Sequence, residues 1–234
     1  MAVVRLEHGK VNALDLELCQ AISTTFAGPD VLGARAVVLT GAGSAFSAGV
    51  DLWRVIEGGD HYAAAFIPAL VDAFAAVFTC ELPVVAAING HAIAGGCVFA
   101  AACDHRIMTR GLIGIPELIV GVPFPATALA IVEHAYGPLA TRRLAFGGEL
   151  AAAEDALARG LVDELTGLDA LVDTAVARAG HLAGSIPPAT YAVTKLHLNR
   201  LPAPSAYDDE VVRLWQERVA DGWIAAYMQR TVKR

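Results

Sequence analysis

The sequence of 234 residues has little lysine and no block of like charges. Lysine stands only at Lys10, Lys195 and Lys233, and the formal net charge is −7. A nucleic-acid-binding domain needs a basic patch or stripe to neutralise phosphates. We therefore expect no nucleic-acid partner.

Cysteine is also sparse, and its spacing matches no metal or redox motif. The four cysteines are Cys19, Cys80, Cys97 and Cys103. The seven histidines form no HxH or HExxH pattern, so the sequence predicts no metal site. A chain in which 56% of residues are hydrophobic does not need disulfides to hold its core. We expect reduced, buried thiols in a cytoplasmic protein.

We expect neither a signal peptide nor a membrane-spanning segment. Arg5 and Glu7 come too early for the apolar region of a signal peptide. The longest uncharged apolar run, residues 92–103, is too short and too rich in glycine to cross a bilayer. We expect no membrane partner. The length suffices for one sizeable core, with or without a small helical appendage.

Several common catalytic motifs are absent too. No GK[ST] follows a glycine-rich loop, which excludes a P-loop nucleotide-binding site. The loop that begins at Gly41 reads GAGSAF and lacks the third glycine of a dinucleotide fingerprint. Ser44 and Ser47 are not part of a GxSxG elbow, which argues against a serine hydrolase.

What is present is an alternation of β-prone and helical segments. It predicts parallel strands joined by crossover helices. From residue 168 onward the pattern is helical only. We therefore divide the chain into an α/β core, residues 1–170, and a C-terminal helical segment, residues 171–234. The expected strands are 2–6, 34–40, 84–88, 105–108 and 161–165, with a further short strand inside the proline-rich loop 112–125. The expected helices are 12–26, 61–79, 127–136, 139–146, 152–159, 168–183, 188–199 and 208–233.

Two glycine-containing loops follow two of these strands. The first, residues 41–52, reads GAGSAFSAGVDL, and the second, residues 88–104, reads INGHAIAGGCVFAAACD. In the second loop Gly95 and Gly96 open a helix of small residues. The first N–H groups of a helix are unpaired and can stabilise negative charge. Either loop alone would be interpreted as a tight turn. Asp104, at the end of the second loop, is expected to be a buried structural carboxylate that binds backbone.

Taken together, the two loops resemble those of the crotonase family, the enoyl-CoA hydratases and isomerases. The resemblance extends to Asn12-Ala13-Leu14, to GIPEL at residues 114–118 and to ALARGLVDEL at residues 156–165. It implies the ClpP/crotonase fold, with a repeated ββα core and a C-terminal helical segment. It also implies an acyl-CoA substrate, no cofactor beyond its CoA moiety, and a homotrimer or dimer of trimers. The family usually has a further strand before the one at Val3.

The resemblance assigns an oxyanion hole to the backbone N–H groups of Val50 and Gly95. Such donors stabilise the enolate that forms when a proton is removed beside a thioester. Hydratases of the family use two carboxylates to activate a water. One of these positions holds Glu117 here, but the other, three residues after the oxyanion glycine, holds Val98.

The single carboxylate favours a Δ3-Δ2 enoyl-CoA isomerase with Glu117 as acid and base. Its apolar neighbours in sequence predict a raised pKa. Other branches of the family place an Asp eight residues beyond this Glu, where the chain has Pro125. Two alternatives remain open: an enoyl-CoA hydratase despite Val98, and a non-catalytic acyl-CoA binding protein.

Further residues are assigned to substrate binding by the same resemblance. Lys10 is placed near the CoA phosphates, although a solvated loop lysine is an equal alternative. The aromatic residues of the last helices, Trp215, Trp223 and Tyr227, look suited to packing against neighbouring subunits. The remaining assignments are Ala48 and Leu52 to the CoA groove, Tyr227 and Arg230 to a pair that closes over the nucleotide, and Trp53, Ile56, Tyr62 and Val98 to the acyl pocket.

Overall fold

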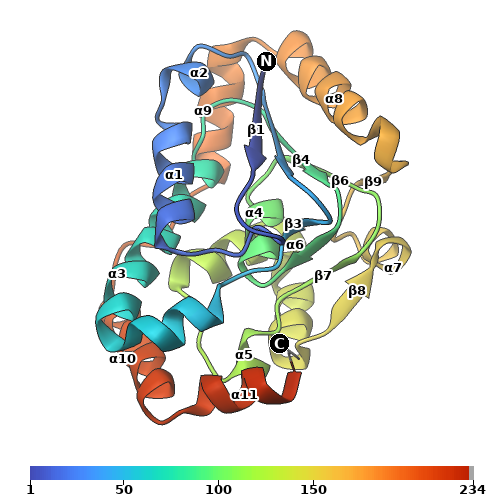
Figure 1. The fold of residues 1–234 in the computed structure, drawn as a ribbon. Coiled ribbons are helices and arrows are strands. Elements are labelled where there is room, and N and C mark those ends of the chain that lie inside the picture. The colour runs from blue at the N-terminus through green and yellow to red at the C-terminus, as the bar shows by residue number, and fades with distance from the viewer. Residues whose placement is uncertain (232–234) are drawn as a thin grey trace.

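The computed structural model describes residues 1–231, which form two β-sheets surrounded by helices (Figure 1). Strands β1, β4 and β6 have the bounds that the sequence predicts. The elements in chain order are β1 (Ala2–Leu6), α1 (Leu16–Phe26), α2 (Pro29–Leu32), β2 (Val37–Gly41), β3 (Ala45–Ser47), α3 (Leu52–Phe78), β4 (Val84–Ile88), β5 (His91–Ile93), α4 (Gly95–Ala101), β6 (His105–Met108), β7 (Leu112–Gly114), α5 (Glu117–Val120), α6 (Ala126–Gly147), β8 (Leu150–Ala152), α7 (Ala153–Ala158), β9 (Glu164–Leu165), a 3₁₀ turn (Leu168–Ala170), α8 (Leu171–Ser185), α9 (Pro188–Leu198), α10 (Ala206–Ala220) and α11 (Trp223–Thr231).

A strand–strand–helix unit occurs three times, as β2-β3-α3, β4-β5-α4 and β6-β7-α5. The first strand of each unit joins a parallel sheet of order β1-β2-β4-β6-β9. The second joins a sheet of order β3-β5-β7-β8, in which only β7 and β8 are antiparallel. This arrangement confirms the expected crotonase-like α/β fold. Strand β7 lies in the loop 112–125, where a short strand was expected. Strands β3 and β5 were expected to be parts of loops, because three residues are too few to show alternation.

The central strands β2 and β4 of the five-stranded sheet are buried on both faces, as is usual in parallel sheets, whereas the edge strand β1 exposes Val3 and Arg5. Strands β2 and β4 have no exposed residue. Their side chains alternate between faces. Leu39 and Val84 enter the main core, whereas Val38 and Val85 pack with alanines of α8. In Figure 1, α8 lies on the opposite side of the sheet from α1 and α3.

Helix α3 begins earlier than the sequence predicts, because Asp51 caps it by accepting the N–H of Trp53. At Gly59 (φ 63°) the helix is broken. Among the described residues, α3 is the helix long and apolar enough to cross a membrane by length and composition. Its apolar side chains, Phe66 and Phe74 among them, are buried in the core, which accounts for that composition.

The C-terminal helix expected over residues 208–233 consists of α10 and α11, and residues 232 and 233 of that prediction lie outside the described chain. Gly222 (φ 77°) stands between the two helices. Ser205 and Asp208 form a capping box that starts α10. Both helices contribute to the main hydrophobic core, through Trp215 and Met228 among others. In Figure 1, α11 lies directly beneath α5.

A buried ion pair attaches α9 to the sheet. As expected, Asp104 accepts a backbone hydrogen bond, from Val84 N–H at 2.7 Å. It also pairs with Lys195 Nζ at 2.7 Å, which sequence reasoning did not anticipate. The Lys195 side chain is buried and donates a second bond to the Leu82 carbonyl.

Candidate active site

Asn12 holds the first glycine loop in place from the N-terminal side. It is fully buried and has a left-handed backbone (φ 51°), which asparagine tolerates better than most residues. Its side-chain amide donates to the carbonyls of Ala42 and Ala45, both at 3.0 Å, while its side-chain oxygen accepts the His8 N–H. The loop after β2 is therefore fixed before any ligand arrives.

Two backbone bonds then set the direction of the Val50 peptide. Leu14 N–H donates to the Gly49 carbonyl at 2.8 Å, and Asp51 N–H donates to the Leu14 carbonyl at 2.9 Å. In a parallel bridge of this kind, the residue between the two bonded neighbours turns its own N–H and C=O the other way. Within residues 1–231, the Val50 N–H has no hydrogen-bond partner. It is available to an acceptor on the side away from Leu14.

The two loops meet at Gly49, where no larger residue fits. Gly49 has φ 84°, and a Cβ there would lie 2.6 Å from Ala94 Cβ and 3.5 Å from Gly95 N. Gly95 is the first residue of α4, so its N–H has no acceptor inside the helix. The unpaired N–H groups of Val50 and Gly95 thus belong to two loops in direct contact, the arrangement that an oxyanion hole needs.

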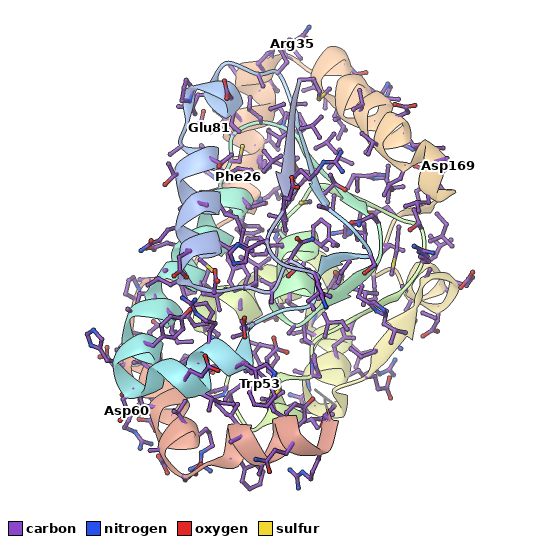
Figure 2. All side chains as sticks on the ribbon, viewed as in Figure 1. Phe26, Arg35, Trp53, Asp60, Glu81 and Asp169 are labelled. Carbon is purple, nitrogen blue, oxygen red and sulfur yellow. The ribbon has the colours of Figure 1, made fainter. Side chains whose placement is uncertain are left out.

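A cavity of about 400 Å³ lies beside these loops. Six of the residues assigned from sequence line it: Ala48, Val50, Leu52, Trp53, Glu117 and Tyr227. In Figure 2, Trp53 lies between the start of α3 and helix α11. The other lining residues are Val11, Ala13, Asp51, Ile93, Ala94, Pro116, Val120, Val122, Trp215 and Met228.

Glu117 is the first residue of α5 and stands in a mostly apolar wall of this cavity. Its side chain is buried, and no atom of the described chain hydrogen-bonds to its Oε2. Desolvation raises the pKa of Glu117 from 4.5 to about 8. A carboxyl group that titrates near neutral pH is suited to take up a proton and to return it.

A second carboxylate lines the cavity, but it already has a structural role. Asp51 Oδ1 accepts the N–H groups of Trp53 and Arg54, both at 3.1 Å, and so caps α3. These bonds fix the side chain against the helix. Glu117 is the lining carboxylate that has no such partner.

Val98 does not reach the cavity. It lies in α4, is 1% exposed and belongs to the main hydrophobic core. It therefore neither lines the acyl pocket, as the sequence led us to expect, nor supplies a polar group. The position where a hydratase is expected to carry its other carboxylate is occupied by a hydrocarbon side chain.

Ile56 and Tyr62 also stand outside the cavity lining, contrary to expectation. The Tyr62 hydroxyl accepts the Leu16 N–H at 2.9 Å at the start of α1, and its ring stacks on Phe66. The side chain joins α1 to α3 and is not turned to a ligand. Ile56 and Tyr62 follow Trp53 in α3, on either side of the break at Gly59, and only Leu52 and Trp53 at the beginning of the helix border the cavity.

Two basic residues assigned to CoA lie at the surface. Lys10 is exposed and precedes Val11, which lines the cavity. Arg230 is exposed on α11, three residues after the lining residue Tyr227. Both side chains are free to move toward a phosphate near the cavity. Their roles stay predictions.

Several lining residues were not assigned to the site from the sequence. Trp215 and Met228 come from the C-terminal helices, and Val120 and Val122 flank the end of α5. We expected the C-terminal aromatic residues to pack against other subunits, but Trp215 is buried in this chain's own cavity wall. The position of a tryptophan on a helix is the same whether it packs within its own chain or against another subunit. Only the fold therefore identifies the residues that Trp215 contacts.

Comparison with known proteins agrees with this geometry. A profile of the enoyl-CoA hydratase/isomerase family matches residues 1–207. A putative enoyl-CoA hydratase of Thermus thermophilus is 37% identical over 197 residues, which cover 82% of this chain and 76% of that protein. A probable enoyl-CoA hydratase of Mycobacterium avium is 34% identical over 186 residues, or 76% and 70% of the two chains.

Solved structures share the fold over nearly the whole chain. Human mitochondrial Δ3-Δ2-enoyl-CoA isomerase superposes with a TM-score of 0.82 at 24% identity, covering 97% of this chain and 92% of that one. An enoyl-CoA isomerase of Mycobacterium tuberculosis gives 0.76 at 28% identity, with 94% and 93% covered. Since the family profile spans most of the sequence and the fold agrees with it, this chain belongs to the enoyl-CoA hydratase/isomerase family.

Proposed function

We propose that this protein is an enoyl-CoA isomerase that moves a carbon–carbon double bond between the Δ3 and Δ2 positions, with Glu117 as its only acid–base group. The observation that carries the proposal is the set of carboxylates at the cavity. Glu117 Oε2 has no hydrogen-bond partner in the described chain, Asp51 caps a helix, and Val98 stands where a hydratase is expected to have a second carboxylate.

The chemistry needs one base and one anion site. With the thioester carbonyl oxygen between the N–H groups of Val50 and Gly95, the Glu117 carboxylate takes a proton from C2. The electron pair moves onto the thioester oxygen and gives a dienolate, which the two N–H groups stabilise. One such donor contributes a factor of about 10² to 10³ in rate.

The second half of the reaction returns the same proton. The Glu117 carboxyl group gives it to C4, the double bond settles between C2 and C3, and the carboxylate is regenerated. The reaction neither consumes nor releases water. The raised pKa of Glu117 supports this role, because the protonated form is then a usable intermediate near neutral pH.

The names of relatives support two readings. The Mycobacterium tuberculosis protein, at 27–28% identity, is described as an isomerase in one solved structure and as a probable enoyl-CoA hydratase in another. The Thermus thermophilus and Mycobacterium avium proteins are named as hydratases, which keeps hydration as the second candidate. A hydratase must hold a water between two groups, and a valine at residue 98 cannot hydrogen-bond to one.

Two spectrophotometric assays separate the candidates. We expect a trans-3-enoyl-CoA to be converted to the conjugated 2-enoyl-CoA, and a trans-2-enoyl-CoA to be hydrated slowly or not at all. Rapid hydration of the 2-enoyl substrate, without isomerisation, would overturn the proposal. Tight binding with no conversion of either substrate would identify a non-catalytic acyl-CoA binding protein.

A matched pair of variants tests the base. Glu117→Gln keeps the size of the side chain but cannot accept the proton, so turnover should fall by at least ~10²-fold, within the range of general-base effects. Acyl-CoA binding should remain. Glu133→Gln removes a carboxylate from the exposed surface of α6 and should leave turnover unchanged. Near-normal activity of Glu117→Gln would refute the assignment.

We also propose that the chain assembles as a homotrimer or a dimer of trimers and needs no cofactor beyond the CoA of its substrate. Support for assembly comes from large apolar side chains that this chain leaves exposed on α6. Leu139 and Phe146 are the most exposed of them. Light scattering on the purified protein tests the proposal, and a monomeric mass would overturn it.

A further inference from the structure

The lining of the cavity changes in exposure from one end to the other. At one end Val11 is 39% exposed, and the neighbouring Ala48 is partly exposed. At the other end Val122, Trp215 and Met228 are all buried. Val11 accepts a backbone hydrogen bond from Ala48, and Trp215 bonds to Pro123 beside Val122, so the exposed and the buried lining residues form two separate groups. The cavity is therefore open at Val11 and Ala48 and closed where Val122, Trp215 and Met228 lie, while Tyr227 beside Met228 is partly exposed.

A CoA thioester can enter such a cavity in one direction only. The nucleotide of CoA is large and charged, so it must remain at the open end, where Lys10 precedes Val11. This direction places α11 at the acyl end of its own cavity and argues against the predicted closure of Tyr227 and Arg230 over the nucleotide bound there. The carbonyl oxygen is then at Val50, and the acyl chain continues past Glu117. The helix that begins with Glu117 ends at Val120, which belongs to the buried part of the lining. The acyl tail consequently points at the closed end.

Trp215 is held rigidly in that closed end. It is 2% exposed, and its Nε1–H donates to the Pro123 carbonyl at 3.1 Å. The bond satisfies the polar atom of the ring and leaves a hydrocarbon surface toward the cavity. Breaking it to let the ring swing aside would leave a buried donor unpaired, at a cost that disfavours movement.

Two further contacts strengthen the same wall. The Tyr207 hydroxyl donates to the Phe124 carbonyl at 3.1 Å. The Trp223 ring lies against Gly121, so closely that a Cβ on that glycine would come within 2.2 Å of the ring nitrogen. The C-terminal helices thus contact residues 121, 123 and 124, the segment that follows the helix of Glu117.

From these observations we infer that Trp215 and Met228 form an end wall that limits acyl length, so that the protein takes short- to medium-chain, apolar acyl-CoA thioesters. This inference rests on the proposed use of the cavity for an acyl-CoA. The volume of about 400 Å³ is near the lower end of ligand pockets, roughly 300–1,000 Å³, and the reacting thioester occupies part of it. Polar substituents on the acyl tail would be buried against hydrocarbon without a partner.

The test measures binding of saturated acyl-CoA thioesters with four to sixteen carbons, because these cannot react. Affinity should rise by about fourfold with each added methylene, then stop rising at a definite chain length, which we call the break. Met228→Ala and Trp215→Phe should move this break to longer chains, and Val122→Met should move it to shorter ones. Met108→Ala truncates a buried methionine of β6 outside the cavity and should leave the break in place.

An unchanged break in both Met228→Ala and Val122→Met would overturn the inference, even if Trp215→Phe failed to fold. So would an affinity that rises through sixteen carbons in the unsubstituted protein, or no binding at any length. Because the test measures binding without turnover, its outcome does not depend on whether the proposed reaction is correct. A break that moves as expected, in a protein that isomerises nothing, would refute the isomerase and keep the wall.

Discussion

Replacing Glu117 with glutamine should make the folded protein more stable at alkaline pH, even as it removes activity. In the unfolded chain the carboxyl group has its ordinary pKa of 4.5, and in the folded protein desolvation raises the pKa to about 8. Between these values the folded state binds a proton that the unfolded state has lost. The free energy of unfolding therefore falls as pH rises through this window.

The size of the effect follows from the shift. At 1.36 kcal/mol per pKa unit, a change from 4.5 to about 8 corresponds to roughly 5 kcal/mol. This is an upper bound, since water that enters the cavity lowers the cost of the charge. The stabilisation of Glu117→Gln relative to the unsubstituted protein should be constant below about pH 4.5, grow up to about pH 8, and level off above that value.

The assay is urea unfolding followed by tryptophan fluorescence, at one protein concentration and at several pH values from 5 to 9. A constant effect of the amide on packing cancels, because the comparison concerns the slope with pH. For Glu133→Gln, on the exposed face of α6, the free energy of unfolding should change with pH as it does in the unsubstituted protein. If Glu117→Gln shows the same pH dependence, the buried carboxyl group is not desolvated and the reasoning fails.

Four further measurements test the site and its supports. The value of kcat/KM should increase with pH and level off above about pH 8, because the free enzyme needs the Glu117 carboxylate; a profile that is flat from pH 6 to 9 would exclude that base. Gly49→Ala forces a side chain against Ala94, so kcat should fall by ~10²-fold or more, as for loss of one oxyanion donor; unchanged kcat would contradict the geometry. Lys195→Met leaves the Asp104 charge without its partner and should cost about 3 kcal/mol in urea unfolding, much of it recovered in a double variant with Asp104→Asn. Asn12→Ala removes the amide that fixes the first loop, and it should lower kcat more than it raises KM.

Much of the fold was predictable because its strands appear in the sequence as short apolar runs, and the central ones are buried on both faces. Strands β1, β4 and β6 were found with their observed bounds. Of the short strands in the second sheet, only the one near β7 was expected, since such strands leave no periodic pattern. The part of α3 before the break at Gly59 was not predicted. The helix break at Gly222 was missed, because a single glycine in an apolar pattern is compatible with a continuous helix.

The residues of the candidate site also divide into those that the sequence identified and those that only the fold identified. Val50, Gly95 and Glu117 were assigned from sequence because each belongs to a short motif whose neighbours in the chain are its neighbours in space. Trp215 and Met228 come from helices far along the chain from Glu117, and no local pattern connects them to it. Their side chains could be placed only after the C-terminal helices had been located on the segment that follows α5.

The contacts of Tyr207, Trp215 and Trp223 with residues 121–124 also bear on the order in which the protein becomes functional during synthesis. Both glycine loops and Glu117 leave the ribosome well before α10 and α11 do. A nascent chain can thus complete its strands and carry its base while the far end of the cavity is still open to water. Proteolytic removal of the segment after residue 205 would open the same wall and also take part of the main hydrophobic core away, leaving the carboxyl group of Glu117 hydrated and its affinity for the proton lowered.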